Sequence, residues 1–274
     1  MPVPFAAPSW LFPGTVEENV RFLTGKVREC ALLCFGPEMP ELSEDFWASA
    51  GPGLRWHVHL PTALRAPDGT WADAWLFGPE RFASLCADLY KKCAGLAPWC
   101  AVLHFPSLHG CPRHEARERL LRFFREWERQ GLDRALLLPE NVRGARHEDF
   151  ADLLSGMSLC FDAAHHLSFV GAVLPAEHVL RDAALFHWSA PCGGDAHRAL
   201  TALSPEGYAF FGRLASVLPT GRTHCIEVFD SDGFFASCPV LESLLGCRAA
   251  GPAADGRSEG RTKLKGMDGH VHNT

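Results

Sequence analysis

The sequence predicts an α/β fold, a (β/α)8 barrel of the TIM type, on three observations. Short apolar runs alternate with amphipathic segments, residues that can bind metal follow many of these runs, and no glycine-rich phosphate loop follows the first run. An open doubly wound sheet, the alternative, usually carries such a loop, but Phe35-Gly36-Pro37 matches neither G-x-G-x-x-G nor a P-loop. The length of 274 residues suits one barrel.

Seven apolar runs predict the barrel strands. None of them alternates cleanly between apolar and polar residues, as expected for strands of a parallel sheet that are buried on both faces. The segment His197–Leu203 is expected to be a degenerate eighth strand. The seven predicted strands are Val27–Phe35, Leu54–Leu60, Cys100–Phe105, Arg134–Pro139, Ser158–Phe161, Ala183–Trp188 and His224–Phe229.

Helical periodicity lies between the predicted strands. Apolar residues at positions i, i+3, i+4 and i+7 predict helices over residues 82–93 and 116–127. Ser204-Pro205-Glu206 predicts a helix start, with Ser204 as the N-cap and proline at the first helical position, and this helix is expected to end near Leu218. A last short helix is predicted at Leu241–Leu245.

These elements divide the chain into three parts. Residues 1–26 are expected to be an N-terminal segment that covers the barrel, and residues 27–248 the catalytic barrel domain. Residues 249–274 are rich in glycine and charge without apolar periodicity, so a disordered tail is expected there.

Composition limits the partners and the compartment. A net charge of −6 argues against duplex DNA, whose binders usually present a basic surface. The 11 cysteines are odd in number and form no C-x-x-C pair, which favours a reduced, cytoplasmic protein over a disulfide framework. Neither a signal peptide nor a transmembrane run is apparent, so no membrane association is expected.

Nine acidic and imidazole side chains at or near the ends of apolar runs are the candidate metal ligands. The carboxyl ends of barrel strands share one face, where active sites of this fold lie. Carboxylates with neutral imidazoles form a ligand set for zinc, manganese or iron. The nine are His59, His104, Glu140, Asp162, His165, His187, Asp195, His197 and Glu227.

Structural roles compete with metal binding for some of these residues. Asp162 and Asp195 could each cap a helix. Glu140 and Glu227 are harder to explain in this way, because each belongs to an apolar run and would be buried without a partner. Buried carboxylates need cations nearby, so these two residues favour a metal site.

His57 and His59 are alternatives for one ligand position. They lie two residues apart, hence on the same side of a strand, and either could point inward. The H-x-P pattern at His59–Pro61 favours His59.

Several short motifs carry a resemblance to a known family over Val27–Gly246. They are H-x-P at His59–Pro61, His104 with a following proline, Pro139-Glu140-Asn141, D-x-x-H at Asp162–His165, His187 after a strand, D-x-H at Asp195–His197, and Glu227 in the last strand. With them the chain resembles the AP endonuclease/xylose isomerase-like TIM-barrel superfamily, and the full set is similar to the trinuclear site of its phosphodiester-cleaving branch.

The resemblance implies two to three divalent metal ions of zinc, manganese or iron, with Glu140, Glu227 and Asp162 as the catalytic carboxylates. Glu140 would bridge the first two ions. The other ligands implied are His59 and His104 for the first ion, Asp162, His187 and Glu227 for the second, and His165, Asp195 and His197 for the third. The implied reaction is attack of a metal-bound hydroxide on the phosphorus of a phosphodiester.

The opening of the chain implies a more specific substrate. Ser9-Trp10, Pro13-Gly14-Thr15, Glu18-Asn19 and Phe22-Leu23 are similar to the opening of bacterial cobamide-remodelling phosphodiesterases. That resemblance implies cleavage of the nucleotide loop of a cobamide, a vitamin B12-like corrinoid, so that its lower ligand can be replaced. A small phosphodiester also agrees with the net negative charge and with the lack of long basic loops.

Two other functions stay open. A mononuclear sugar isomerase or epimerase would need Glu140, Asp162, His187 and Glu227 alone, which leaves the other candidate ligands unused. A non-catalytic corrinoid- or metal-binding protein is the third possibility.

Overall fold

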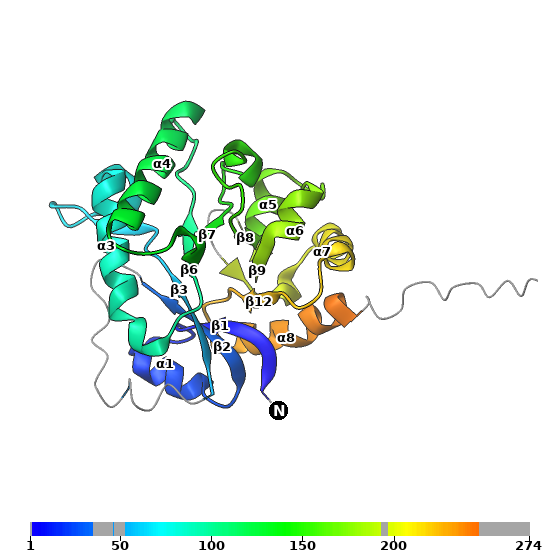
Figure 1. Ribbon diagram of the computed structural model, residues 1–274. Helices are drawn as coiled ribbons and strands as arrows, with labels where there is room; N and C mark the ends of the chain where they lie inside the picture. Colours follow the sequence, from blue (N-terminus) through cyan, green and yellow to red (C-terminus); the bar gives the residue numbers. More distant parts are fainter. Residues whose placement is uncertain (1, 35–45, 47–52, 193–196, 247–274) are drawn as a thin grey trace, which may run out of the picture.

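Eight parallel strands form a closed barrel with the helices packed around it (Figure 1). This computed structural model describes residues 2–34, 46, 53–192 and 197–246. The strand order around the barrel is β1-β12-β9-β8-β7-β6-β3-β2, which confirms the predicted (β/α)8 class. The barrel strands are β1 (Val3–Pro8), β2 (Val27–Leu33), β3 (Arg55–His59), β6 (Ala101–His104), β7 (Leu137–Glu140), β8 (Leu159–Asp162), β9 (Ala183–Trp188) and β12 (Thr223–Ile226).

The remaining elements are helices and two small hairpins. The α-helices are α1 (Val16–Leu23), α3 (Pro79–Lys92), α4 (Arg113–Arg129), α5 (Ala163–Phe169), α6 (Glu177–Asp182), α7 (Pro205–Val217) and α8 (Ser231–Gly246). Short 3-10 helices are Ala74–Phe77, Ala94–Leu96, Arg134–Leu136, His147–Phe150 and Leu200–Ala202. The hairpins pair β4 (Ala63–Arg65) with β5 (Trp71–Asp73) and β10 (Ala190–Pro191) with β11 (His197–Arg198).

The eighth strand is β1, at the N-terminus, and not the predicted His197–Leu203. Within that segment, His197 and Arg198 form β11, which pairs with β10 outside the barrel. The expectation that residues 1–26 cover the barrel is therefore also wrong, because β1 pairs with both β2 and β12. Pro4 and Pro8 argue against a strand in the sequence, because proline has no backbone N–H to donate to a neighbouring strand. The pairing with β2 is irregular between Val3 and Ala6.

The other predicted strands are present with small changes at their ends. The largest change is at Arg134–Leu136, which forms a 3-10 helix ahead of β7 instead of its first half. Asp133 explains the difference, because its side chain accepts a hydrogen bond from the backbone N–H of Ala135 and caps that turn.

The predicted helices are confirmed, and the last one is longer than expected. The apolar stripes of α3 and α4 are buried against the barrel and each other. The hydroxyl of Ser204 accepts a hydrogen bond from the N–H of Gly207 and begins α7 as an N-cap. Helix α8 extends over sixteen residues and contains Pro239. Because proline is unfavourable inside a helix, local propensity predicts only the part of α8 that follows Pro239.

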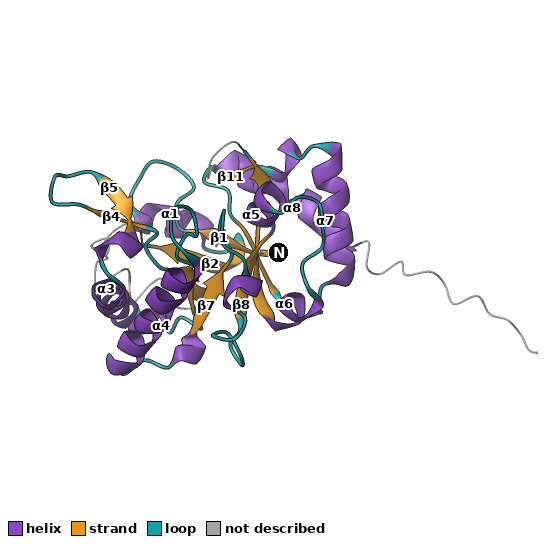
Figure 2. Cartoon of the chain, turned by 90° about the horizontal axis from the view of Figure 1, so that it is seen from above, coloured by secondary structure: helices purple, strands orange, loops and turns teal. Residues whose placement is uncertain are grey.

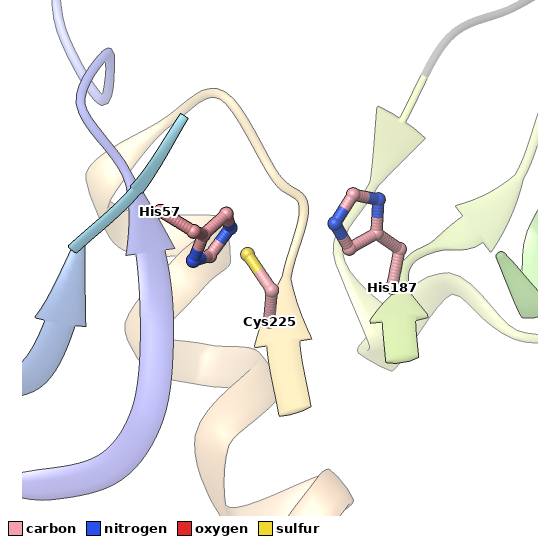
Figure 3. Close-up of side chains that lie close together, drawn as sticks. All are labelled: His57, His187 and Cys225. Atoms are coloured by element: carbon pink, nitrogen blue, oxygen red, sulfur yellow. The ribbon is translucent and has the colours of Figure 1, made fainter. Parts of the chain in front are cut away.

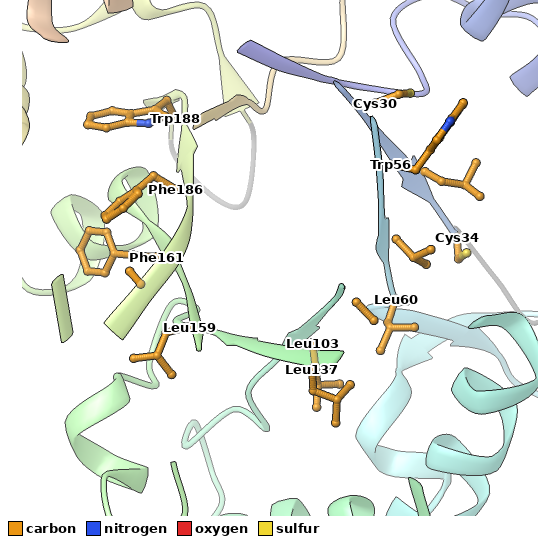
Figure 4. Packing of buried hydrophobic residues seen from close by; sticks show 14 of the residues in the cluster. Cys30, Cys34, Trp56, Leu60, Leu103, Leu137, Leu159, Phe161, Phe186 and Trp188 are labelled. Atoms are coloured by element: carbon orange, nitrogen blue, oxygen red, sulfur yellow. The ribbon is translucent and has the colours of Figure 1, made fainter. Parts of the chain in front are cut away.

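Two layers of buried side chains fix the barrel. The large aromatic and aliphatic residues pack between strands and helices, and Figure 4 shows part of this outer layer, including Trp56, Phe161 and Trp188. A separate inner cluster holds mostly small side chains: Ala6, Ala31, Cys100, Val102, Leu138, Cys160, Leu185 and Cys225. Since side chains alternate along a strand, residues two positions after these also face the barrel interior.

The hairpin β4–β5 extends away from the barrel wall, as the view from above shows (Figure 2). Within the described residues, no helix combines the length and apolarity needed to cross a membrane. The predicted tail and Asp195 lie outside the described residues.

Candidate metal centre

Strand alternation brings five of the candidate ligands to one place. Each of them lies two residues after a member of the inner cluster and therefore extends the inward-facing row toward the carboxyl end of its strand. The pairs are Val102 and His104, Leu138 and Glu140, Cys160 and Asp162, Leu185 and His187, and Cys225 and Glu227. The sequence thus places small or apolar side chains in the barrel interior and metal-binding side chains above them.

Glu140, at the end of β7, occupies the centre of this group. It is fully buried. Its Oε1 lies 2.8 Å from Nδ1 of His187. Its Oε2 lies 3.3 Å from Nε2 of His104 and 3.4 Å from Nε2 of His59. One carboxylate oxygen therefore faces each of two different sets of imidazoles.

Glu227, the residue after β12, contacts both sets. Its Oε2 lies 3.2 Å from Nδ1 of His187 and 3.7 Å from Nδ1 of His197. Its Oε1 lies 3.7 Å from Nε2 of His59. Within the described residues, the ion-pair partners of Glu140 and Glu227 are imidazoles, neither Lys nor Arg.

Asp162 has both of the roles considered for it. As the N-cap of α5, it accepts a hydrogen bond at Oδ1 from the backbone N–H of His165. Its Oδ2 is buried and has no hydrogen-bond partner. Asn141 holds the backbone of Asp162 from the neighbouring strand: the side-chain amide donates to the carbonyl of Asp162 at 2.8 Å, and Asn141 Oδ1 accepts from its N–H at 2.9 Å.

Two clusters of predicted ligands share Glu140, and a third, of His59, His187 and Glu227, overlaps both. Within each cluster the donor atoms lie within 4.8 Å of one another. Three of the atoms, His59 Nε2, Glu140 Oε2 and Asp162 Oδ2, are buried without a hydrogen-bond partner. Buried polar atoms normally have one, so their common direction fits a bound cation. Of the two clusters that share Glu140, one is His59, His104 and Glu140, and the other is Glu140, Asp162, His187 and Glu227.

The set assigned by resemblance to a third ion is only partly described. The rings of His165 and His197 lie 5.7 Å apart between centroids, and both residues line the same pocket. Neither belongs to a cluster of donors within 4.8 Å among the described residues, and Asp195 is not described. A third metal position remains a prediction.

Burial and mutual charge set the ionisation of the centre. Burial favours the neutral form of Glu140, but the charges of His187 and His104, with the hydrogen bond from His187, hold its pKa well below the usual range. For Asp162, burial dominates and raises the pKa, and Glu140 and Glu227 add to the rise. Three carboxylates that have no Lys or Arg partner in the described part of the chain thus share one buried space, and a divalent ion would neutralise their charge.

A pocket of about 740 Å³ opens onto the centre. His59, His104, His165, His197 and Glu227 line its floor side, together with aromatic residues of the surrounding loops. The hairpin β4–β5 contributes Trp71, whose surface is 59% exposed, and Asp73. Arg143, also in the lining, is a basic residue at this pocket. The aromatic lining residues are Trp71, Trp75, Phe105 and Phe229.

His57 and His59 contact different carboxylates. Both rings are buried, and His59 contacts Glu140 whereas His57 contacts Glu29, with 2.6 Å between Nδ1 of His57 and Oε1 of Glu29. Glu29, Asn141 and Cys225 are not among the nine predicted ligands. Asn141 followed Glu140 in a quoted motif, but no local pattern pairs Glu29 with a histidine 28 residues later.

Solved structures share this fold at low sequence identity. No protein-family model matches the chain, and no curated protein does so. A D-tagatose 3-epimerase-like protein is 14% identical with a TM-score of 0.62, over 90% of this chain and 98% of that one. An AP endonuclease, family 2, from Brucella melitensis is 12% identical with a TM-score of 0.61, over 89% and 98%. A Thermus thermophilus protein, TTHB071, in crystals soaked with ZnCl2, is 23% identical with a TM-score of 0.56, over 90% and 98%.

The chain has the xylose isomerase-like TIM-barrel fold. Epimerase and AP endonuclease names both occur among structures that share it, so the likeness does not resolve the branch. In this xylose isomerase-like barrel, the ligand-type side chains lie at the carboxyl ends of the strands, the face on which TIM barrels carry active sites.

Proposed function

We propose that this protein is a metal-dependent phosphodiester hydrolase. The supporting observation is the position of Glu140, which belongs to both donor clusters and directs one oxygen toward each. A carboxylate placed in this way can bridge two metal ions. Mononuclear proton-transfer chemistry does not require His59 and His104 on the second oxygen.

Two divalent ions would supply a nucleophile at neutral pH and neutralise charge that develops on phosphorus. His59 and His104 would hold one ion with Glu140, while Asp162, His187 and Glu227 would hold the other. Asn141 fixes the backbone of Asp162 and hence the direction of its free oxygen. The Leu60 carbonyl accepts a hydrogen bond from Nδ1 of His59 at 3.0 Å, so the lone pair of Nε2 would be free to bind the ion.

The substrate proposed is the nucleotide loop of a cobamide. The pocket over the centre is lined by four aromatic residues and by Arg143, which suits a large, partly apolar molecule that carries a phosphate. The quoted N-terminal motif builds the loop after β1: Asn19 accepts hydrogen bonds from the N–H groups of Leu11 and Phe12, and Thr15 caps α1. This loop follows the carboxyl end of a barrel strand, on the same face as the pocket.

A sugar epimerase with one metal ion is the second candidate. The observation that favours it is the four-residue cluster of Glu140, Asp162, His187 and Glu227, which offers a complete set of ligands by itself. A non-catalytic corrinoid- or metal-binding protein would have the same clusters without turnover.

Metal content and two assays separate these functions. The full chain would be stripped with chelator, reloaded with zinc, manganese or iron, and its metal counted per chain by mass spectrometry. Two or three ions, with hydrolysis of bis(p-nitrophenyl) phosphate and of a cobamide, are expected. One ion with epimerisation of a ketohexose would replace the proposal by the second candidate.

Matched variants complete this experiment. Glu140→Gln keeps the shape of the side chain but removes the bridging charge, and a loss of hydrolysis by at least about 100-fold is expected from the loss of metal. His178→Gln changes an exposed histidine on α6 and should leave both metal content and turnover unchanged. Full activity in Glu140→Gln would contradict the assignment, and no turnover of any substrate by the loaded protein would favour the binding protein.

A further inference from the structure

A second group of metal-binding side chains lies inside the barrel, one layer below the candidate metal centre. It contains His57 of β3, His187 of β9 and Cys225 of β12, whose donor atoms lie within 4.8 Å of one another. The three residues are at most 1% exposed. Figure 3 shows the side chain of Cys225 between the two rings, with its sulfur toward His57.

The hydrogen bonds of His57 leave one nitrogen free for a ligand. Its Nδ1 lies 2.6 Å from Oε1 of Glu29, which also accepts a hydrogen bond from the indole of Trp99 at 2.8 Å. Arg55 pairs with the second oxygen of Glu29 at 3.2 Å, so this carboxylate is ionised and Nδ1 carries the proton. The remaining Nε2 is buried and without a hydrogen-bond partner. Metal-binding histidines are commonly oriented by a carboxylate in this way.

His187 presents a second nitrogen to the same space. Its Nδ1 faces Glu140 and Glu227, whereas its Nε2 is buried without a hydrogen-bond partner. In Figure 3 the ring nitrogen farther from the backbone points toward Cys225. Carboxylates therefore hold the Nδ1 side of both rings, and the two Nε2 atoms converge on one sulfur.

We propose that His57, Cys225 and His187 form a second metal site, for a soft or borderline ion such as zinc, cadmium or copper(I). Two imidazole nitrogens with one thiolate suit such ions better than the oxygen-preferring ones. Around zinc, bonds of about 2.0–2.3 Å put tetrahedral ligand atoms about 3.3–3.6 Å apart. The three donor atoms of His57, Cys225 and His187 lie within 4.8 Å of one another. To bind one zinc ion, each would therefore have to move inward by about 1 Å at most.

Binding at this site would release a proton. Cysteine binds a metal ion as the thiolate, so an ion at this site displaces the thiol proton of Cys225. The ion takes the place of the thiol proton, which passes to solvent, and a sulfur–metal bond forms without oxidation or reduction. A divalent ion bound by two neutral imidazoles and one thiolate keeps a net charge of one. The carboxylate of Glu29 lies on the other side of the His57 ring from this charge.

Sharing His187 makes the inner site depend on the candidate metal centre. A neutral imidazole has one lone pair, so His187 can bind an ion in one site, or in both only after losing its second proton. A soft ion in the barrel would therefore compete with the carboxylate cluster for this ring. The proposed inner site does not depend on which reaction the candidate metal centre catalyses.

Cobalt(II) tests the inner site, because a cobalt–thiolate bond gives a charge-transfer absorption that nitrogen and oxygen ligands do not give. The full chain, stripped with chelator, would be titrated with cobalt(II). The band is expected in the wild type and in Glu140→Gln, which lacks the bridge of the outer centre. It should be lost in Cys225→Ser, and in His57→Gln the cobalt affinity should fall at least about 10-fold.

Two other barrel cysteines serve as controls. Cys100→Ser removes a buried thiol of the inner cluster that belongs to no donor group among the described residues, and Cys160→Ser removes one that lies near Glu140 and His187. Both should keep the band. Loss of the band in Cys160→Ser, or its persistence in Cys225→Ser, would overturn the proposal. X-ray absorption of the cobalt-loaded wild type is independent of any variant's folding: a sulfur at about 2.3 Å is expected, and a shell without sulfur would also overturn it.

Discussion

Nδ1 of His187 lies 2.8 Å from Oε1 of Glu140, across β8, which separates their strands. Both side chains are at most 1% exposed, so water screens the contact little. Burial favours the neutral ring, whereas the charges of Glu140 and Glu227 favour the protonated ring and raise the pKa of His187 above its usual value. The two carboxylates therefore hold the Nδ1 side of this ring.

Metal removal should lower thermal stability. An ion that binds the folded chain at 100 times its dissociation constant adds about 2.7 kcal/mol, which for a chain of this size corresponds to a shift in Tm of about 5–10 °C. Differential scanning calorimetry of zinc-loaded and chelator-treated protein measures this shift. Glu140→Gln should reduce this shift, whereas His178→Gln should leave it unchanged. An equal Tm with and without stoichiometric zinc would count against binding at these buried carboxylates.

Replacing Asn141 by Leu should weaken the centre without touching a ligand. The change removes both hydrogen bonds to the backbone of Asp162, and unsatisfied buried groups of this kind cost about 1–3 kcal/mol each. Asp162 then loses its fixed direction, and metal affinity is expected to fall about 10–100-fold. Competition with a chromogenic chelator gives the affinity, and urea unfolding gives the stability. Unchanged zinc affinity in a folded Asn141→Leu protein would show that this support is unnecessary.

Trp71→Ala should separate a large substrate from a small one. Trp71 lines the pocket from the β4–β5 hairpin and is 59% exposed, so its truncation should alter stability little. The KM for a cobamide is expected to rise about 10-fold, while hydrolysis of bis(p-nitrophenyl) phosphate stays unchanged. Leu76→Ala, an exposed residue next to the pocket lining, is the matched control. An equal loss with both substrates would place Trp71 in the support of the metal centre instead.

His147 should make the protein less stable in mild acid. Burial lowers its pKa to about 4, while its Nε2 hydrogen-bonds the carbonyl of Pro139 at 3.1 Å. The folded pKa is depressed, so this contribution is complete above the unfolded pKa of about 6.5 and is lost as the pH falls toward 4. Over that range the loss amounts to about 3 kcal/mol, and to about 2 kcal/mol between pH 7 and 5.

The comparison of wild type with His147→Gln isolates this residue from other titrating groups. Urea unfolding at pH 7 and pH 5 should show a smaller loss of stability in the variant, because glutamine can donate the same hydrogen bond but does not titrate. The same loss in both proteins would mean that other groups cause it.

The fold was predictable because seven of the eight strands lie in short, largely apolar runs without clean alternation, as in a parallel sheet. The strand that escaped prediction, β1, contains two prolines, and its pairing partners come from β2 and from β12, about 220 residues away. Local composition carries no information about such a partner. The same limit applies to α8, whose apolar residues are held by packing despite Pro239.

Candidate ligands at strand ends were visible in the sequence because alternation and strand ends are local properties. Their division into two clusters around Glu140 was not, since it depends on which carboxylate oxygen faces which ring. The inner group was less accessible still. His57 is oriented by Glu29 on a neighbouring strand, a contact that local sequence does not predict. Cys225 has the sequence context of an ordinary small apolar residue.

The pairing of β1 with β12 also sets an order of events during synthesis. Ala6 is synthesised long before its partner Cys225, because β2, β3 and β6 to β9 all lie between them in the chain. Until then β1 has β2 as its sole barrel neighbour, and one edge of the growing sheet stays open. Glu227 follows that last strand by one residue. The nascent chain thus acquires the last carboxylate of the candidate metal centre in the same step that closes the barrel.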